Sequence, residues 1–229
     1  MGVDLVLSSG FLAFAAQAGF LAGVEDVGVE VDGLCGTSSG ALAAALWSAG
    51  MPAEELFGEL CQRTPLSWVR PHLRVWRGLF ALDAVIHRLS EDLPGRFEEL
   101  PHAFGAGVAE GGEARLLTSG PLVEAVAASC AVPYLFAPVQ VEGRAFLDGG
   151  AVDRTMLRRW RGHRPGRVVV LHLVEASHGV VRPHDEEGDV VVRSPPSGAK
   201  LWSLGDARSR FLAARARARE SLEAQLGRT

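Results

Sequence analysis

The chain has 229 residues, 48% of them hydrophobic and 22% charged, which fits one well-packed globular domain and excludes extensive disorder or two full-sized domains. Its 23 Lys and Arg residues against 27 Asp and Glu residues give a net charge of −4, so no overall basic field points to nucleic acid. The cysteines Cys35, Cys61 and Cys130 lack C-x-x-C spacing, which favours neither a disulfide framework nor a zinc site.

The N-terminal residues 1–7 lack the positive region of a signal peptide. Acidic residues interrupt the longest apolar stretch before it reaches the length that spans a bilayer. Together with an odd set of cysteines, these features predict a cytoplasmic protein that meets membranes only at their surface.

The first part of the chain alternates strands and helices. Residues 3–7 form an apolar run that predicts a strand, and a turn at 8–10 leads into an apolar helix at 11–22. A second strand is predicted at 29–35 and a second helix at 41–47. This strand–helix order is typical of an α/β fold whose parallel strands are joined by right-handed crossovers.

The remaining elements continue the domain through its C-terminus. We predict helices at 52–60, 82–89 and 121–129, and strands at 105–109, 114–118, 139–141, 145–147 and 167–173. Residues 178–199 mix charged residues with proline and glycine without periodicity, which predicts an exposed loop, and residues 204–227 predict an Ala- and Arg-rich terminal helix. We therefore expect a single domain over residues 1–229, with its core at about 3–175.

The pentapeptide Gly36-Thr37-Ser38-Ser39-Gly40 lies where the second predicted strand runs into a helix. In that context a G-x-S-x-G pattern indicates a nucleophile elbow, in which small flanking residues let a serine hydroxyl protrude and the helix N-terminus faces developing negative charge. Ser38 is the candidate nucleophile. The alternative is a plain turn in which Gly36 and Gly40 provide flexibility before an N-capping serine.

Four segments match one family in the same order along the chain. They are residues 5–10 (LVLSSG), 36–41 (GTSSGA), 128–139 (ASCAVPYLFAPV) and 148–150 (DGG). On these segments the sequence resembles the patatin-like phospholipase family over most of its first 155 residues. The resemblance implies a single three-layer α/β domain with a mostly parallel central sheet.

The resemblance also implies a serine–aspartate dyad that needs no histidine, metal or cofactor. Asp148 would accept the proton of Ser38 and later activate water against an acyl-enzyme, while Gly149 and Gly150 leave the carboxylate unobstructed. Such a base requires a carboxylate within hydrogen-bond reach of the hydroxyl and dry enough to be more basic than an exposed aspartate. The alternative for Asp148-Gly149-Gly150 is an ordinary Asp-Gly turn.

The first loop departs from the family pattern of three glycines followed by a basic residue. Ser9, Gly10 and Phe11 occupy the glycine positions, and Ala13 stands where the basic residue is expected. Backbone N–H groups bind an oxyanion, so these three residues can still provide the donors. The missing cation leaves neutral acyl esters or a decayed activity open, and a strand-to-helix turn with a capping serine is the alternative for this loop.

Histidines and a basic segment offer further possibilities. The order Ser38, Asp148, then His172 or His178 matches a Ser-His-Asp triad, but His172 lies in an apolar strand, which favours a structural role. Residues 63–80 carry four arginines and two tryptophans without an acid, which predicts either transient membrane-surface contact or a lid packed on the core. The arginines of the terminal helix predict a solvated face.

Taken together, these features predict a lipid acyl hydrolase of the phospholipase A or lysophospholipase type that works through an acyl-Ser38 intermediate, with an apolar groove for the acyl chain. An acyltransferase or thioesterase would use the same elbow. A non-enzymatic alternative takes Gly33, Gly36 and Gly40 as a nucleotide-binding turn, and a catalytically decayed lipid-binding module is also open.

Overall fold

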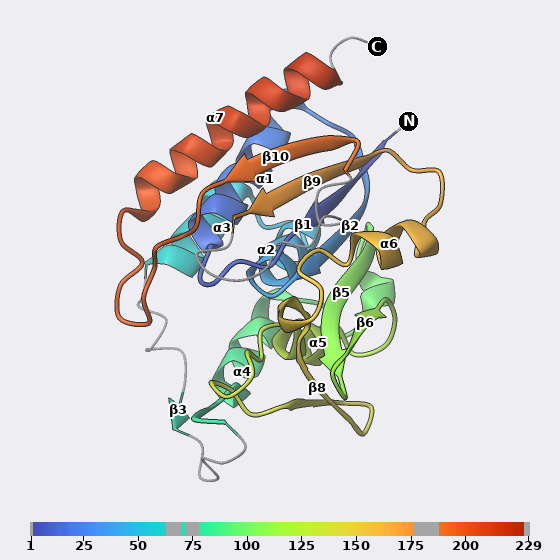
Figure 1. Cartoon of the computed structure of the whole chain (residues 1–229), viewed down its shortest axis with the longest axis vertical. Coiled ribbons are helices and arrows are strands. Elements are labelled where there is room, and N and C mark those ends of the chain that lie inside the picture. The colour runs from blue at the N-terminus through green and yellow to red at the C-terminus, as the bar shows by residue number, and fades with distance from the viewer. Residues whose placement is uncertain (1, 63–69, 72–77, 176–187, 227–229) are drawn as a thin grey trace.

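A central sheet of eight strands organises the computed structural model, which describes residues 2–62, 70–71, 78–175 and 188–226 (Figure 1). The strands are β1 (Val3–Leu7), β2 (Val31–Thr37), β5 (Ala103–Glu110), β6 (Glu113–Leu117), β7 (Val139–Val141), β8 (Arg144–Asp148), β9 (Val169–Val174) and β10 (Val190–Ser194). A separate small ribbon joins β3 (Arg70–Pro71) to β4 (Phe80–Ala81). The helices are α1 (Phe14–Val27), α2 (Ser39–Ser48), α3 (Ala53–Cys61), α4 (Asp83–Asp92), α5 (Leu122–Ser129), α6 (Leu157–His163) and α7 (Ala207–Gln225).

The sheet follows the order β10-β9-β1-β2-β5-β8-β7, and β6 pairs with β5. Strands β10, β9, β1, β2 and β5 are parallel, whereas β6, β7 and β8 run antiparallel to their neighbours. Every residue of β1 and β9 is buried, as expected for central strands covered on both faces. The predicted α/β fold with a mostly parallel sheet is confirmed.

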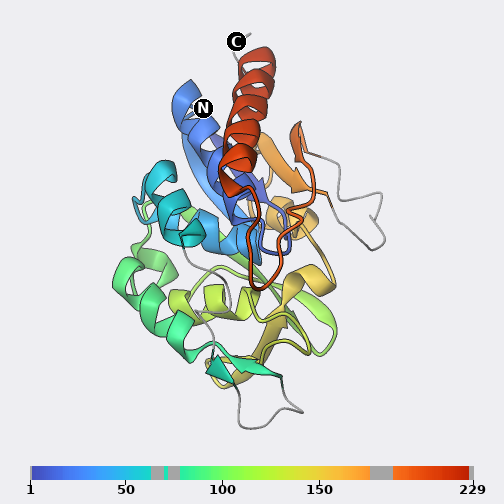
Figure 2. The same ribbon diagram turned by 90° about the vertical axis from the view of Figure 1, so that its left-hand side faces the viewer.

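Alternate residues of the strands enter two separate cores. Leu5, Leu7 and Leu34 pack into the larger core together with α1, α2, α3, α5 and α7. Val6 and Cys35 point to the opposite face, where Trp160 of α6 is fully buried against them. Helix, sheet and helix therefore form three layers, the third of which is thin, and Figure 2 shows α7 lying alongside α1 in the thick layer.

Two elements differ from the sequence-based expectation. The prediction of an exposed loop over 178–199 is wrong for residues 190–194, which form β10, because Val190 and Val192 bury their side chains and the strand pairs with β9. Residues 178–187 lie outside the described part of the chain. Helix α6 was not expected from the sequence, since its seven residues are too short to show a clear helical period.

Helices α1 and α7 approach so closely that glycine is required between them. A Cβ atom at Gly19 would lie 2.2 Å from the carbonyl oxygen of Phe211, and one at Gly23 would lie 2.5 Å from the Cβ of Ala218. These contacts involve backbone and short side chains, which cannot rotate away. The glycines of α1 thus allow the terminal helix to cover the thick layer.

We predict that Gly19→Ala lowers the free energy of unfolding by about 1–3 kcal/mol, because the added methyl group overpacks the α1–α7 contact. The matched control is Gly58→Ala in α3, where a Cβ would meet only the flexible Gln62 amide at 3.4 Å. That variant should gain about 0.5–1 kcal/mol from its better helix propensity. Urea denaturation measures both changes, and equal stability of the two variants would contradict the described packing.

Candidate active site

The site lies where the last residues of two strands, β2 and β8, pair with consecutive residues of β5. Thr37, the last residue of β2, pairs with Gly107, and Asp148, the last residue of β8, pairs with Val108. Both strands occupy the same edge of β5, because β6 pairs along its other edge over the same residues. Ser38 leaves the sheet one residue after Thr37, so the pairing register brings this serine next to Asp148.

The backbone at Ser38 has the conformation of a nucleophile elbow. Its φ of 55° and ψ of −123° lie in a region that residues with a side chain seldom adopt. A Cβ at Gly36 would lie 2.5 Å from the backbone nitrogen of Ala41, and one at Gly40 would lie 2.3 Å from the carbonyl oxygen of Leu7. Both flanking glycines are therefore required by crowding rather than by positive φ.

Buried side chains hold the elbow in place. The Ser38 N–H donates to the Oγ of Ser129 at 2.9 Å, and the Ser129 hydroxyl donates to the carbonyl oxygen of Gly107 at 2.6 Å. The thiol of Cys130 donates to the Ser38 carbonyl oxygen at 3.4 Å. Ser129 thus links the nucleophile to β5, a role that sequence reasoning missed although this residue belongs to the matched 128–139 segment.

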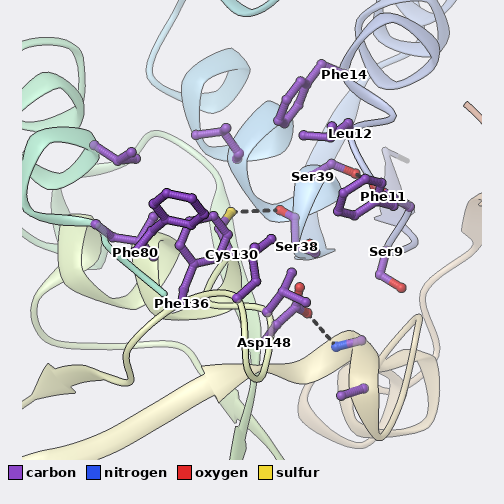
Figure 3. A pocket seen from close by; sticks show the side chains of 18 of the residues that line it. Ser9, Phe11, Leu12, Phe14, Ser38, Ser39, Phe80, Cys130, Phe136 and Asp148 are labelled. Carbon is purple, nitrogen blue, oxygen red and sulfur yellow. Dashed lines mark hydrogen bonds between the residues drawn. The ribbon is translucent and has the colours of Figure 1, made fainter. Parts of the chain in front are cut away.

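Asp148 is 5% exposed, and burial raises the pKa of its carboxyl from 3.8 to about 6. Hydrogen bonds from the Ser38 hydroxyl and the Gly150 N–H act in the opposite direction on this pKa and are outweighed by burial. The Gly150 N–H donates to the Asp148 Oδ1 at 2.7 Å. Figure 3 shows the Ser38 and Asp148 side chains lining the same cavity.

Neither glycine after Asp148 has space for a side chain. A Cβ at Gly149 would lie 2.7 Å from the backbone of Gly107, and one at Gly150 would lie 2.6 Å from the Cβ of Ser9. The segment is a short 3₁₀ helix, Gly149–Ala151, capped by the Asp148 carboxylate, so it differs from a simple exposed Asp-Gly turn. The close packing brings the loop after β1 against the base of the site.

The loop after β1, residues 8–11, is called the oxyanion loop below. The Ser9 N–H donates to the Arg154 carbonyl oxygen at 2.7 Å and is therefore occupied, which removes Ser9 from the expected set of free donors. Among the described residues, nothing accepts a hydrogen bond from the N–H of Gly10 or of Phe11. The Ser39 hydroxyl donates to the Gly10 carbonyl oxygen at 2.8 Å and ties this loop to the elbow.

The expected alternative of a helix-capping serine in this loop is not what the structure shows. Helix α1 begins after Ala13 without a side-chain cap. Ser8 instead accepts the N–H of Val174 at 2.9 Å through its Oγ, which joins the ends of β1 and β9. The loop is thus held by neighbouring strands and leaves two N–H groups for another acceptor.

An apolar cavity of about 340 Å³ opens from Ser38 and Asp148 between α1, α3 and α4. This volume lies within the range of small-molecule sites, roughly 300–1,000 Å³. Its wall consists mainly of large aliphatic and aromatic side chains, namely Phe11, Leu12, Phe14, Leu42, Leu60, Phe80, Leu82, Val85, Leu89, Val132, Leu135, Phe136 and Leu201. Figure 3 shows four phenylalanines of this wall, Phe11, Phe14, Phe80 and Phe136, among the side chains that line the cavity with Ser38 and Asp148.

His172 has a structural position, as its apolar strand predicts. It is fully buried in β9, with its ring nitrogens 2.7 Å from the Oε1 of Gln17 and 3.0 Å from the Oγ of Ser194. Burial lowers the pKa of this imidazole to about 3, and its ring stacks on Phe20. Both nitrogens are therefore engaged away from Ser38, whereas His178 lies outside the described residues.

The nucleotide-binding alternative requires Gly33 in a turn, and the structure places it elsewhere. Gly33 lies inside β2, where it pairs with Ala103, and a Cβ there would collide with Trp160 and Arg164. Its small size thus serves packing between strand and helix. A phosphate-binding turn would need this glycine in the loop after the strand.

A model of the family described as patatin-like phospholipase matches residues 5–158, more than half of the chain. The chain belongs to the patatin-like phospholipase family. The matched range contains the elbow, the Asp148 segment and the oxyanion loop, and ends at the start of α6.

Curated relatives of this patatin-like chain include uncharacterized NTE family proteins from Mycobacterium tuberculosis and Mycobacterium bovis. Each is 28% identical over 216 residues, which cover 90% of this chain and 59% of the relative. The chain thus spans well under two thirds of the length of these relatives.

Solved structures with the same fold include VipD from Legionella pneumophila, with a TM-score of 0.63 and 12% identity over 98% of this chain and 67% of that chain. They also include ExoU from the type III secretion system of Pseudomonas aeruginosa, in complex with SpcU, with a TM-score of 0.56 and 17% identity over 98% of this chain and 53% of that one. At these identities the likeness shows the fold alone.

Within the described part of this patatin-like chain, no helix has the length and apolarity needed to cross a bilayer.

We predict that Asp148→Asn stabilises the protein at pH 8. The folded-state pKa of about 6 exceeds the ordinary 3.8, so ionising Asp148 costs the folded state free energy as the pH rises through this window. A shift of about 2 units corresponds to a gain of up to about 3 kcal/mol for the amide at pH 8, fading toward pH 4. Guanidinium denaturation at both pH values tests this, and a pH-independent difference would contradict it.

Proposed function

We propose that this chain is a lipid acyl hydrolase that cleaves carboxylic esters of phospholipids or related lipids, of phospholipase A or lysophospholipase type. Ser38 is the nucleophile and Asp148 the general base. The observation that carries the proposal is a serine with a strained backbone next to a buried carboxylate of raised pKa. Both residues line an apolar cavity.

The reaction follows from this arrangement. Asp148 accepts the proton of the Ser38 hydroxyl while the Ser38 Oγ attacks the ester carbonyl carbon. The negative charge that develops on the carbonyl oxygen is stabilised by hydrogen bonds from the N–H groups of Gly10 and Phe11. The protonated carboxyl then returns its proton to the leaving alcohol, which leaves an acyl group on Ser38. Water activated by the Asp148 carboxylate hydrolyses this ester and restores the free serine.

The cavity fits the acyl part of such a substrate. Leucines of α2, α3 and α4 contribute to its wall, and each methylene group transferred from water into this lining contributes about 0.8 kcal/mol of binding. Among the described residues, Asp148 is the one charged side chain of the lining. The apolar end therefore selects for hydrocarbon, whereas the alcohol portion of the ester would face the open side.

We also propose that the open side contacts a lipid surface. Of the basic segment 63–80, the structure describes only residues 70–71 and 78–80. Leu79 is 51% exposed and Tyr134 is 93% exposed, and the Leu79 N–H donates to the Tyr134 carbonyl oxygen at 3.3 Å. Their neighbours Phe80 and Leu135 line the cavity, so these two exposed side chains lie on the outer surface next to this wall.

The backbone beside these exposed side chains has two positive φ angles. Tyr134 has a φ of +68°, and Gly78 has a φ of +142° with no space for a Cβ against Phe136 and Ala137. Large side chains left exposed, one of them at a residue with a strained backbone, indicate contact with a partner. Since the cavity behind them is apolar, a lipid surface is the partner that fits.

For the dyad, we predict that a fluorophosphonate probe labels the wild-type protein and not Ser38→Ala. Asp148→Asn should lower kcat for a lipid ester by about 10²–10⁴-fold, because the base is lost. In the wild type, kcat/KM should rise with pH through about 6, since the ionised carboxylate is the active form. Ser90→Ala, at an exposed serine of α4, is the matched control and should retain labelling.

The outcomes of the dyad experiment distinguish between the hypotheses. Full turnover by Asp148→Asn would reject the dyad while leaving Ser38 as the nucleophile. Labelling without release of fatty acid into water would redirect the proposal to acyl transfer. Absence of labelling in the wild type would reject the hydrolase altogether.

For the lipid surface, we predict that the double variant Leu79→Ser/Tyr134→Ser loses about tenfold in hydrolysis of phospholipid vesicles and keeps its activity on a soluble short-chain ester. The control is Leu212→Ser, which removes a comparably exposed leucine from α7. Fatty acid release and vesicle co-sedimentation provide the readouts. Equal losses on both substrates would show that the changes affect the site rather than surface contact.

A further inference from the structure

Arg154 holds the oxyanion loop by hydrogen bonds and is not among the residues that line the cavity. Its Nη2 donates to the Ser9 carbonyl oxygen at 3.0 Å and also to the Val174 carbonyl oxygen. In return, the Ser9 N–H donates to the Arg154 carbonyl oxygen at 2.7 Å. The segment after Asp148 and the oxyanion loop are thus joined by a reciprocal pair of hydrogen bonds, and the end of β9 is attached to the same guanidinium.

The geometry of a trans peptide turns this contact into an orientation of the Gly10 N–H. The C=O of Ser9 and the N–H of Gly10 belong to one peptide plane and point in opposite directions, and the described chain has no cis peptide. Arg154 binds the C=O, so the N–H must point away from Arg154. Gly10 lines the cavity, and no described residue accepts its N–H.

The next peptide is held in the same way by a neutral group. The Ser39 hydroxyl donates to the Gly10 carbonyl oxygen at 2.8 Å, which directs the Phe11 N–H to the opposite side of that plane. Two successive peptides of the loop are therefore fixed at their carbonyl oxygens by side chains from other elements. Only the first of them receives a charged donor.

A charged donor has a second effect on the peptide. A guanidinium bound to a carbonyl oxygen draws electron density toward that oxygen and strengthens the N–H of the same peptide as a donor. Ala13, at the position where a basic residue is expected, is 2% exposed and carries no charge. Arg154 brings a cation to the same loop from a different part of the chain.

We propose that Arg154 is a positioning residue of this site, which orients and polarises the Ser9–Gly10 peptide so that the Gly10 N–H stabilises the oxyanion of the transition state. This inference rests on the proposed ester hydrolysis. Arg154 does not contribute to the raised pKa of Asp148, whose causes are burial, Ser38 and Gly150. Its removal should therefore change the rate without moving the pH profile.

The test compares Arg154→Met, Arg154→Gln and Arg154→Lys with wild type on a soluble short-chain ester. We expect Arg154→Met to lose about 10- to 100-fold in kcat with KM nearly unchanged, less than or equal to the loss of a direct oxyanion donor. Lysine should restore most of the activity and neutral glutamine less. Arg159→Met is the matched control, because Arg159 pairs at the surface with Asp153 at 3.3 Å.

A trifluoromethyl ketone separates positioning from general structural damage, because it forms a tetrahedral oxyanion on the serine. Its inhibition constant should rise in proportion to the loss of kcat/KM across the three variants, while binding of a non-hydrolysable ether analogue stays constant. If Arg154→Met does not fold, the comparison of glutamine with lysine gives the same answer.

Unchanged kcat and unchanged ketone affinity in Arg154→Met, or in the glutamine and lysine pair, would overturn the inference. Loss of ether-analogue binding in parallel with kcat, or a shifted pH profile, would also overturn it by showing a structural or electrostatic effect on the dyad. Failure of the wild-type protein to hydrolyse the ester or react with a fluorophosphonate would instead reject the proposed function.

Discussion

The pairing of two strands with consecutive residues of β5 is the constraint on which the rest of the site depends. Because Thr37 lies opposite Gly107 and Asp148 opposite Val108, two segments far apart in the sequence end side by side. A slip of one residue in either pairing would turn the affected side chain to the other face of the sheet. Gly107 permits this close pairing, since a Cβ there would lie 2.6 Å from both Thr37 and Met156. The core around β5 therefore determines the geometry of the hydroxyl and the carboxylate.

The same arrangement brings together two residues that lower the stability of the folded state. Ser38 has a strained backbone, and Asp148 is a carboxyl group buried without a cationic partner among the causes of its pKa shift. Such features persist only where the surrounding structure holds them, and the surrounding contacts do so here: Ser129 binds the Ser38 N–H, and the Gly150 N–H binds Asp148. Stability is given up at the residues that the proposed chemistry needs, as a trade-off between stability and activity would require.

Local patterns predicted much of this structure, and contacts between distant segments explain what they did not predict. The elbow could be recognised because strand, small residues and helix follow one another within residues 31–48. Strand β10 was not recognisable, because its burial depends on pairing with β9 across a charged stretch without periodicity. Arg154 gave no signal either, since its contact with Ser9 spans 145 residues and an arginine after a turn has no distinctive pattern. The sequence could likewise not show that the Ser9 N–H is already occupied, because backbone direction in a loop is set by its partners.

The departures from the family pattern in the oxyanion loop can be explained by the hydrogen bonds that fix the orientation of its peptide planes. An oxyanion needs N–H groups, and these are the same in glycine, serine and phenylalanine; what matters is the direction of each peptide plane. In this chain the direction is imposed at the carbonyl oxygens, by Arg154 on one peptide and by Ser39 on the next. The residues at positions 9 and 11 can therefore differ from glycine while these two anchors remain, whereas a Cβ at Gly10 would lie 2.8 Å from the Cβ of Ala13 and has no space. Substrate preference is separable from this machinery, because part of the cavity wall comes from α1, α3 and α4, so changes in those helices can alter the hydrocarbon that is bound without displacing the pair at the sheet edge.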